Sequence, residues 1–313
     1  MILIVSVENR FACGADLKYL VTGGAGFIGS KIVSELLKNG HDVVVIDNES
    51  SKCHDQFYWS SDAENHKLDI CDFDQIKNLF DGVDTVFHCA AEARIQPSFE
   101  NPLLTVKTNT LGTCSVLQSA REAGVRRVIY SSTSSAYGNN DIPFDENLSS
   151  DCLTPYSVAK VSGESLCKLY YDRFGLETIT LRYFNVYGDR QPLRGSYAPV
   201  IGLFLRQYKE NKPLTIVGDG DQTRDFTHID DVVSANILAI TAKLKNYGQV
   251  INIGTGKSIS INDIAKLISE KRVTLPARLG EARHTKAVIN KAKTCLGWSP
   301  KVNLEKWIME NLK

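Results

Sequence analysis

The sequence lacks an excess of charge of either sign, because its 313 residues carry 36 basic and 36 acidic side chains. Proteins that bind nucleic acid usually show a basic surface, so this balance argues against a nucleic-acid partner. The chain also lacks any apolar run near the ~20 residues that a membrane-spanning helix needs. We therefore expect a protein that binds neither nucleic acid nor membrane, although a few local arginines could hold a small acidic ligand.

Signals for secretion and for metal binding are missing as well. The apolar opening MILIVSV has no basic segment before it and is followed directly by ENR, so a signal peptide is not expected. The eight cysteines are scattered, with no Cys-x-x-Cys and no Cys/His cluster at zinc spacing. We expect free thiols in apolar surroundings, no bound metal, and the cytoplasm as the compartment.

What the sequence does contain is an alternation of short apolar runs and helix-like stretches. Residues 18–48 hold a β-like run, a cluster of glycines, a stretch with helical periodicity that ends at Asn39–Gly40, and the run VVVID. Further β-like runs lie at 84–91, 126–133, 177–185 and 249–256. This alternation predicts an α/β fold of the doubly wound Rossmann type, with helices on both faces of a parallel sheet.

The last third of the chain is less regular and has arginine-rich loops, in GDRQPLRGSY, VGDGDQTRDF and PARLGEARH. We predict a Rossmann domain that binds the cofactor over residues 1–180, in which residues 1–17 are an N-terminal extension. Residues 181–313 are predicted to form mainly a smaller α/β lobe that binds the substrate. This lobe would close over the ligand edge of the sheet, and some of its segments would return to the sheet.

In the motif GGAGFIG, Gly23, Gly26 and Gly29 stand at G-x-x-G-x-x-G spacing between the first predicted strand and the first predicted helix. Glycines at this spacing let the backbone approach a pyrophosphate, and the helix N-terminus supplies amide donors to it. Asp47 ends the second strand, 18 residues after Gly29, where an acid is expected to accept hydrogen bonds from the adenosine ribose. Because its carboxylate would repel a 2′-phosphate, NAD is favoured over NADP.

Three further stretches would contact the same cofactor. An acid after the third β-like run could accept a hydrogen bond from the adenine amino group, and small residues after the fourth strand would let a flat ligand pass closely. Asn109 could reach the cofactor from the next helix, although an ordinary polar helix position is the alternative. The predicted cofactor-binding residues are Gly23, Gly26, Phe27, Ile28, Gly29, Asp47, Asn48, Asp69, Ile70, Ala90, Ala91, Asn109, Tyr156 and Lys160.

The stretch TPYSVAK places Tyr156 and Lys160 four residues apart. In a helix these positions share a face, and a nearby ammonium favours the ionised phenol, so Lys160 is expected to lower the tyrosine pKa from about 10. A phenol tuned in this way can take a proton from an alcohol. A chance pair on a solvated helix face is the alternative, because YKENK has the same spacing at Tyr208 and Lys212.

Several motifs in order extend this pattern. The glycine motif together with SSTSSAYG, TPYSVAK, LRYFNVYG, RDFTHIDDV and NIGTG resembles the extended short-chain dehydrogenase/reductase family, from about Lys18 to the C-terminus. Within that family the chain is most similar to the nucleotide-sugar 4-epimerases that act on UDP-glucose or UDP-N-acetylglucosamine. The resemblance implies an NAD-dependent epimerisation at carbon 4 of a UDP-sugar, through a transient 4-keto intermediate.

The resemblance also implies roles for single residues. Tyr156 would take the proton of the sugar 4-hydroxyl, Lys160 would hold the nicotinamide ribose, and Thr133 would bridge the substrate oxygen and the phenol. The positions that match substrate contacts are Asn185, Arg224, Arg278 and Thr285. The last of these matches a gate beside the sugar 2-substituent, where a small side chain implies that N-acetylated sugars fit as well as plain hexoses.

Other functions stay open. A 4,6-dehydratase would need an Asp-Glu pair directly after Thr133, where this chain has Ser134 and Ser135. A UDP-glucuronate epimerase or decarboxylase would need a uronic acid pocket, and AAEAR at 90–94 resembles the dehydratases more than the galactose epimerases. A non-catalytic NAD-binding sensor would be expected to have lost one of the three catalytic residues.

Relatives pair two apolar helices from each subunit, and residues 103–122 and 156–173 have the required pattern, which predicts a homodimer.

Overall fold

A computed structural model describes residues 17–193 and 198–312 of the protein, so residues 1–16 of the predicted N-terminal extension lie outside the described part. Its centre is a seven-stranded sheet with the order β11-β6-β5-β4-β1-β2-β3. Every pairing within this sheet is parallel, which confirms the predicted Rossmann-type α/β fold. The strands are β1 Lys18–Thr22, β2 Asp42–Ile46, β3 Glu64–His66, β4 Val83–His88, β5 Arg127–Thr133, β6 Glu177–Tyr183 and β11 Gln249–Ile253.

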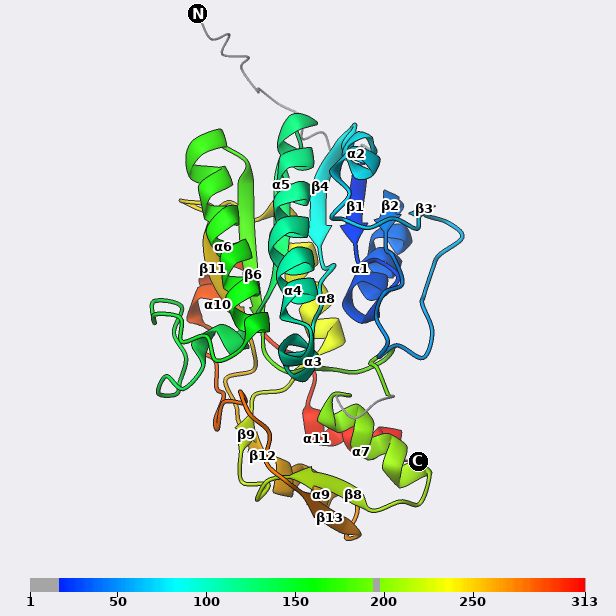
Figure 1. The fold of residues 1–313 in the computed structure, drawn as a ribbon, viewed down its shortest axis with the longest axis vertical. Coiled ribbons are helices and arrows are strands. Elements are labelled where there is room, and N and C mark those ends of the chain that lie inside the picture. The colour runs from blue at the N-terminus through cyan, green and yellow to red at the C-terminus, as the bar shows by residue number, and fades with distance from the viewer. Residues whose placement is uncertain (1–16, 194–197, 313) are drawn as a thin grey trace, which may run out of the picture.

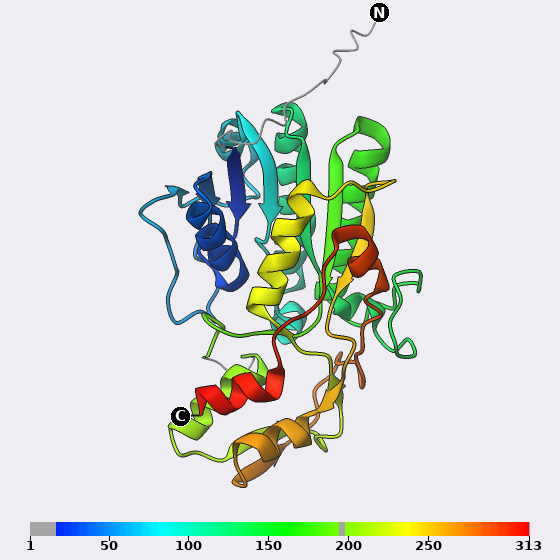
Figure 2. The same ribbon diagram turned by 180° about the vertical axis from the view of Figure 1, so that it is seen from behind.

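Helices cover both faces of this sheet, as Figures 1 and 2 show from opposite sides. Successive strand residues point to opposite faces, so in β1 Val21 packs into one core and Leu20 into the other. The first face carries α1 Phe27–Lys38, α8 Ile229–Thr241 and α10 Asn290–Leu296. The second carries α2 Phe73–Ile76, η1 Lys77–Phe80, α5 Thr113–Glu122 and α6 Pro155–Phe174.

Helix α6 has clear local start and stop signals. The Thr154 side chain accepts from the Ser157 amide, and the Ser157 hydroxyl caps the Thr154 amide in return, while Pro155 takes the first helical position. Gly175 ends the helix in the left-handed conformation, with φ of +73°. The cap fixes the first turn of α6, and that turn carries Tyr156.

The predicted helix at 103–122 is divided into three segments. These are α4 Pro102–Val106, the π-helical segment η2 Lys107–Gly112, and α5. Two further short helices lie near the ends of strands β4 and β5, namely α3 Ile95–Glu100 and η3 Ser134–Tyr137. None of the helices in the described ranges is both long and apolar enough to span a bilayer.

A smaller lobe lies beyond the carboxyl ends of the strands, where the arrowheads of β1 and β4 point in Figure 1. Its core is formed by α7 Val200–Lys209, α9 Ile261–Ile268 and α11 Leu304–Asn311, with the parallel pair β8 Leu214–Val217 and β13 Arg272–Leu275. The short pairs β7 Val186–Tyr187 with β10 Thr227–His228, and β9 Thr223–Arg224 with β12 Ile259–Ser260, join the lobe to the sheet. The predicted domain boundary at residue 180 remains a prediction.

Candidate active site

A cavity of about 890 Å³ lies at the carboxyl ends of the strands, against the C-terminal lobe. Ligands of open parallel sheets bind at this edge. Its wall contains most of the predicted site residues, namely Gly23, Gly26, Phe27, Ile28, Gly29, Asp47, Asn48, Ile70, Ala90, Ala91, Thr133, Tyr156, Asn185, Arg224, Arg278 and Thr285. The fold therefore brings motifs from both halves of the chain to one place.

The glycine turn between β1 and α1 packs so closely against neighbouring backbone that it leaves no room for side chains. Gly23 has φ of +67°, and a Cβ there would lie 2.7 Å from the Ala90 amide nitrogen. A Cβ on Gly29 would lie 2.2 Å from the Gly23 carbonyl oxygen. Gly26 is the N-cap of α1, and no side chain caps the first amides of the helix, which suits them to bind a pyrophosphate.

Asp47 follows the end of β2 and braces this turn. Its carboxylate accepts hydrogen bonds from the amides of Ala25 at 3.1 Å and Glu49 at 2.8 Å. Burial raises the pKa of Asp47, and these amide donors oppose that shift. An acid fixed here, in the wall beside the glycine turn, suits the ribose of NAD. The residues present therefore fit a bound NAD.

Three predicted cofactor residues lie outside the cavity wall, namely Asp69, Asn109 and Lys160. Asp69 accepts from the Cys71 amide at 2.9 Å and lines a separate hollow with Lys107, and its contact with adenine remains a prediction. Asn109 is fully buried, and its side chain bonds the Glu92 main chain, to N at 2.8 Å and to O at 3.0 Å. Asn109 therefore holds the loop that follows β4 instead of facing the cavity.

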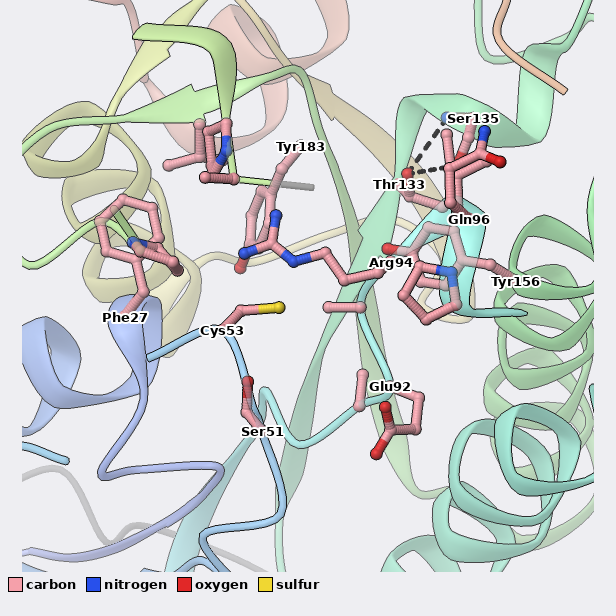
Figure 3. A pocket seen from close by; sticks show the side chains of 18 of the residues that line it. Phe27, Ser51, Cys53, Glu92, Arg94, Gln96, Thr133, Ser135, Tyr156 and Tyr183 are labelled. Carbon is pink, nitrogen blue, oxygen red and sulfur yellow. Dashed lines mark hydrogen bonds between the residues drawn. The ribbon is translucent and has the colours of Figure 1, made fainter. Parts of the chain in front are cut away.

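Tyr156 lies beside Thr133, which ends β5, and both face the cavity in Figure 3. The Thr133 hydroxyl oxygen accepts from the Ser135 amide at 3.1 Å. Burial raises the pKa of Tyr156, whereas the Thr133 hydroxyl and the Arg94 guanidinium lower it. That Lys160 lowers this pKa remains a prediction.

Lys160 is turned toward the sheet. It is 2 % exposed, and its ammonium lies 4.2 Å from the centre of the Tyr130 ring on β5. Burial lowers the pKa of Lys160 to about 8. The second pair at the same spacing has no such surroundings, since Tyr208 is 41 % exposed on α7 and Lys212 pairs with Glu210 at 2.8 Å.

A buried ion pair lies behind the end of β5. Arg182 donates to both carboxylate oxygens of Glu164, at 2.8 and 2.6 Å, and the Ser132 hydroxyl donates to the same carboxylate at 2.6 Å. The pair joins β5, α6 and β6 directly beside Thr133. Breaking such a pair on one side is costly, because it leaves a charge buried without its partner. This support was not predicted, because its members lie far apart in the sequence.

The predicted substrate residues come from the far side of the cavity. Arg224 and Arg278 both pair with Glu281, at 3.5 and 4.0 Å. Guanidinium groups in such a cluster suit a diphosphate. The Asn185 side chain donates to the Thr285 hydroxyl at 3.2 Å.

Thr285 has two functions in the structure. It lines the cavity although it is only 7 % exposed. Its hydroxyl oxygen also accepts hydrogen bonds from the Asp225 amide at 3.1 Å and from the Asn185 side chain. These bonds connect three segments of the cavity wall. A change at Thr285 therefore alters the wall itself as well as the space beside a sugar.

Several residues of the cavity wall were not predicted. Figure 3 shows Cys53, Glu92, Arg94, Gln96 and Tyr183 around the same space. They lie on the loops that follow β2 and β4, in α3, or at the end of β6. Because ligands bind at the carboxyl ends of the strands, the sequence could have indicated that these loops border the cavity. Which of their side chains face the cavity depends on the path of each loop. Within the described ranges no three His, Cys, Asp or Glu side chains gather as a metal site.

Comparisons with known proteins give the family. The chain matches the model of the NAD dependent epimerase/dehydratase family over residues 19–254. It is 37 % identical over 297 residues to a putative UDP-glucose 4-epimerase of Methanocaldococcus jannaschii, which covers 92 % of this chain and 95 % of that protein.

Two solved structures are similar over almost their whole length. The UDP-glucose 4-epimerase of Thermotoga maritima with UDP-glucose has a TM-score of 0.89 at 36 % identity, covering 95 % of this chain and 97 % of that one. The UDP-glucuronic acid 4-epimerase of Bacillus cereus with UDP-glucuronic acid and NAD has a TM-score of 0.87 at 35 % identity, covering 95 % and 98 %. The chain therefore belongs to the NAD-dependent epimerase/dehydratase family of enzymes, within the extended short-chain dehydrogenase/reductases, and its cofactor is NAD.

Proposed function

We propose that the protein inverts carbon 4 of a UDP-sugar, interconverting UDP-glucose with UDP-galactose and also the N-acetylated pair. The observation that carries the proposal is the position of Tyr156 and Thr133, which share one cavity with the glycine turn and with Arg224. One cavity would thereby hold a proton acceptor, a binding site for the cofactor and a cation for the substrate diphosphate.

Each part of the site has a task in this reaction. Gly23, Gly26 and Asp47 hold NAD, which when bound accepts a hydride from carbon 4 and can return it. Tyr156 accepts the proton of the 4-hydroxyl, and Thr133 donates a hydrogen bond to the reacting oxygen. Because burial opposes ionisation of Tyr156, a nearby cation and the Thr133 hydroxyl are needed to favour the phenolate.

Among the alternatives, a dehydratase is disfavoured because the positions after Thr133 carry Ser134 and Ser135 and no acid–base pair. A UDP-glucuronate epimerase or decarboxylase is the second candidate, favoured by the similarity to the Bacillus cereus enzyme. We also propose a homodimer in the cytoplasm as the working form.

The test is direct. The purified protein is incubated separately with UDP-glucose and UDP-N-acetylglucosamine, and the sugar products are resolved by NMR. The proposal expects a galacto-configured product from each, with no loss of water. A 4-keto-6-deoxy sugar as the only product, or no turnover of either sugar, would reject it.

A further inference from the structure

The loop between β2 and β3 forms part of the cavity wall on the cofactor side. Its ends are joined by a hydrogen bond of 2.8 Å from the Trp59 indole to the Glu49 carboxylate, and residues 49–59 are here called the cofactor loop. The His54 Nε2 atom lies 3.6 Å from the place that a Cβ on Gly26 would take, so this loop reaches the glycine turn. The residues of the cofactor loop that line the cavity are Ser50, Ser51, Lys52, Cys53, His54 and Phe57.

Tyr58, near the end of the cofactor loop, is held from two sides. Its amide donates to the Ala25 carbonyl in the glycine turn at 2.8 Å. Its ring contacts the guanidinium of Arg190, which lies 5.0 Å from the ring centre. Arg190 belongs to the connection between β7 and α7, and Figures 1 and 2 show this connection next to the cofactor loop. Because Tyr58 itself lies outside the cavity wall, Arg190 supports the loop from behind.

Arg190 is also docked on α1. Its guanidinium donates to the Ser30 carbonyl at 3.0 Å and to the Ser34 hydroxyl at 3.2 Å. Its φ is +67°, a left-handed conformation that is unfavourable for an arginine and persists where surrounding contacts hold it. Asn185 and Gly188 on the same connection also have positive φ, of +34° and +129°. The connection therefore takes a sharply turned path, and Arg190 holds it against α1.

The same connection forms part of the cavity wall on the substrate side. Pro192, two residues after Arg190, lines the cavity, and so do Asn185 before it and Val200 at the start of α7. A ligand that contacts this wall would restrict the movement of the connection. Restricting the connection would keep Arg190 on the Tyr58 ring for more of the time.

We propose that Arg190 is a positioning residue that couples the two sides of the cavity. It holds the cofactor loop over bound NAD, and a nucleoside diphosphate bound against the lobe strengthens this hold. The proposal rests on the proposed function, because it takes UDP as the part of the substrate that the lobe binds. Coupling of this kind is reciprocal, so bound NAD would also tighten the binding of UDP.

The experiment measures how fast NADH leaves the protein. The protein is loaded with NADH, an excess of NAD is added, and the loss of bound-NADH fluorescence gives the release rate with and without UDP. We compare wild type with Arg190→Gln, Arg190→Lys, Tyr58→Leu and the double variant Arg190→Gln/Tyr58→Leu. The control is Arg272→Gln, whose side chain pairs with Glu270 away from the cavity. Calorimetry gives the affinity for UDP, and the melting temperature checks that each variant is folded.

Arg190→Gln should release NADH about tenfold faster than wild type, as expected for the loss of a cation–π contact and of charge-assisted hydrogen bonds. Arg190→Lys should be intermediate, and Arg272→Gln should match wild type. Tyr58→Leu should also speed release, and the double variant should be no faster than Arg190→Gln, because both substitutions remove the same contact.

The effect of UDP separates coupling from a merely structural role. UDP should slow the release of NADH about fivefold or more in wild type and should have little effect in Arg190→Gln. A purely structural arginine would change the release rate but leave the effect of UDP as it is in wild type.

Three results would overturn the inference. These are a wild-type release rate in Arg190→Gln, an equal effect of UDP in wild type and Arg190→Gln, and single-variant effects that multiply in the double variant. If calorimetry shows no binding of UDP, the proposed function is what fails, and with it the coupling. The release rates without UDP then still decide whether Arg190 holds the cofactor loop.

Discussion

At the scale of single residues, the site depends on charges held in apolar surroundings. Burial raises the pKa of Tyr156 and lowers that of Lys160, so both groups are shifted toward their neutral forms. In the ligand-free protein the Arg94 guanidinium lowers the pKa of Tyr156. The proton-transfer chemistry of Tyr156 is therefore set by residues from three separate segments.

Removal of the phenol hydroxyl should abolish catalysis without unfolding the protein. We expect Tyr156→Phe to lower kcat by about 10²- to 10⁴-fold, because the proton acceptor is lost. NAD content and melting temperature should stay close to wild type. Tyr208→Phe is the matched control, because it removes the same group from the exposed surface of α7. Near-native turnover in Tyr156→Phe would refute the role of this residue.

Lys160 should make stability depend on pH in a defined direction. Its pKa is about 8 in the folded protein against 10.5 when unperturbed, so between these values the unfolded chain binds more protons. The free energy of unfolding should therefore rise with pH across this window, by at most about 1.4 kcal/mol per pH unit. Urea unfolding of ligand-free protein at pH 7.5 and 9.5 would measure it. The rise in the free energy of unfolding should disappear in Lys160→Met and persist in Lys212→Met. An equal rise in wild type and in both variants would show that Lys160 does not cause it.

Asp47 should determine the choice between the two nicotinamide cofactors. Its carboxylate would lie against the 2′-phosphate of NADP, and like charges so close repel strongly. Calorimetry on cofactor-free protein should show NAD binding at least about tenfold tighter than NADP. Asp47→Asn should narrow this gap while its remaining carbonyl still accepts one amide of the glycine turn. Equal affinities in wild type would show that this carboxylate does not select the cofactor.

At the scale of helices, α4, η2 and α6 present an apolar surface to solvent. Leu103 is 83 % exposed and Leu111 52 % exposed on the first two segments, and Val158 and Leu169 are 50 % and 45 % exposed on α6. These helices run side by side over the same face of the sheet in Figure 1. An apolar surface of this kind on a protein of this size favours a partner. A second copy of the chain is the partner that we propose.

The proposed dimer gives a prediction for this surface. Wild type should sediment as a dimer, and Leu103→Asp combined with Leu169→Asp should sediment as a monomer, because four charges would be buried at a two-fold interface. Met309→Asp on α11, where the side chain is 53 % exposed, is the control and should remain a dimer. A wild-type monomer at micromolar concentration would reject the proposal.

Local signals predicted the elements better than they predicted the contacts between them. The cap of α6 and the glycine turn are encoded within a few residues, so TPYS and GGAGFIG indicated them correctly. The π-helical segment η2 was not predictable, because it contains Asn109, whose side chain bonds the main chain of Glu92 on another loop. The same dependence on the path of a loop explains why Arg94 was not among the predicted residues.

At the scale of the whole molecule, the cavity exists only because the two parts of the chain meet. The part of the chain around the sheet supplies the glycine turn, Thr133 and Tyr156, and the lobe supplies Arg224 and Arg278. A hydrogen bond of 2.8 Å from the Gln96 side chain to the Leu279 carbonyl connects α3 with the lobe across the cavity rim. The sequence indicated both parts through their motifs, but it held no information on this contact across the cavity.

The central claim is that the hydride leaves carbon 4 and returns to the same carbon. The most direct test is turnover of UDP-[4-²H]glucose in ordinary water, with deuterium at carbon 4 of the product followed by NMR and mass spectrometry. The account predicts UDP-[4-²H]galactose with the label retained, because NAD carries the hydride within the closed site and Tyr156 exchanges only the hydroxyl proton. Loss of the label to solvent, or its transfer to carbon 6, would contradict the account.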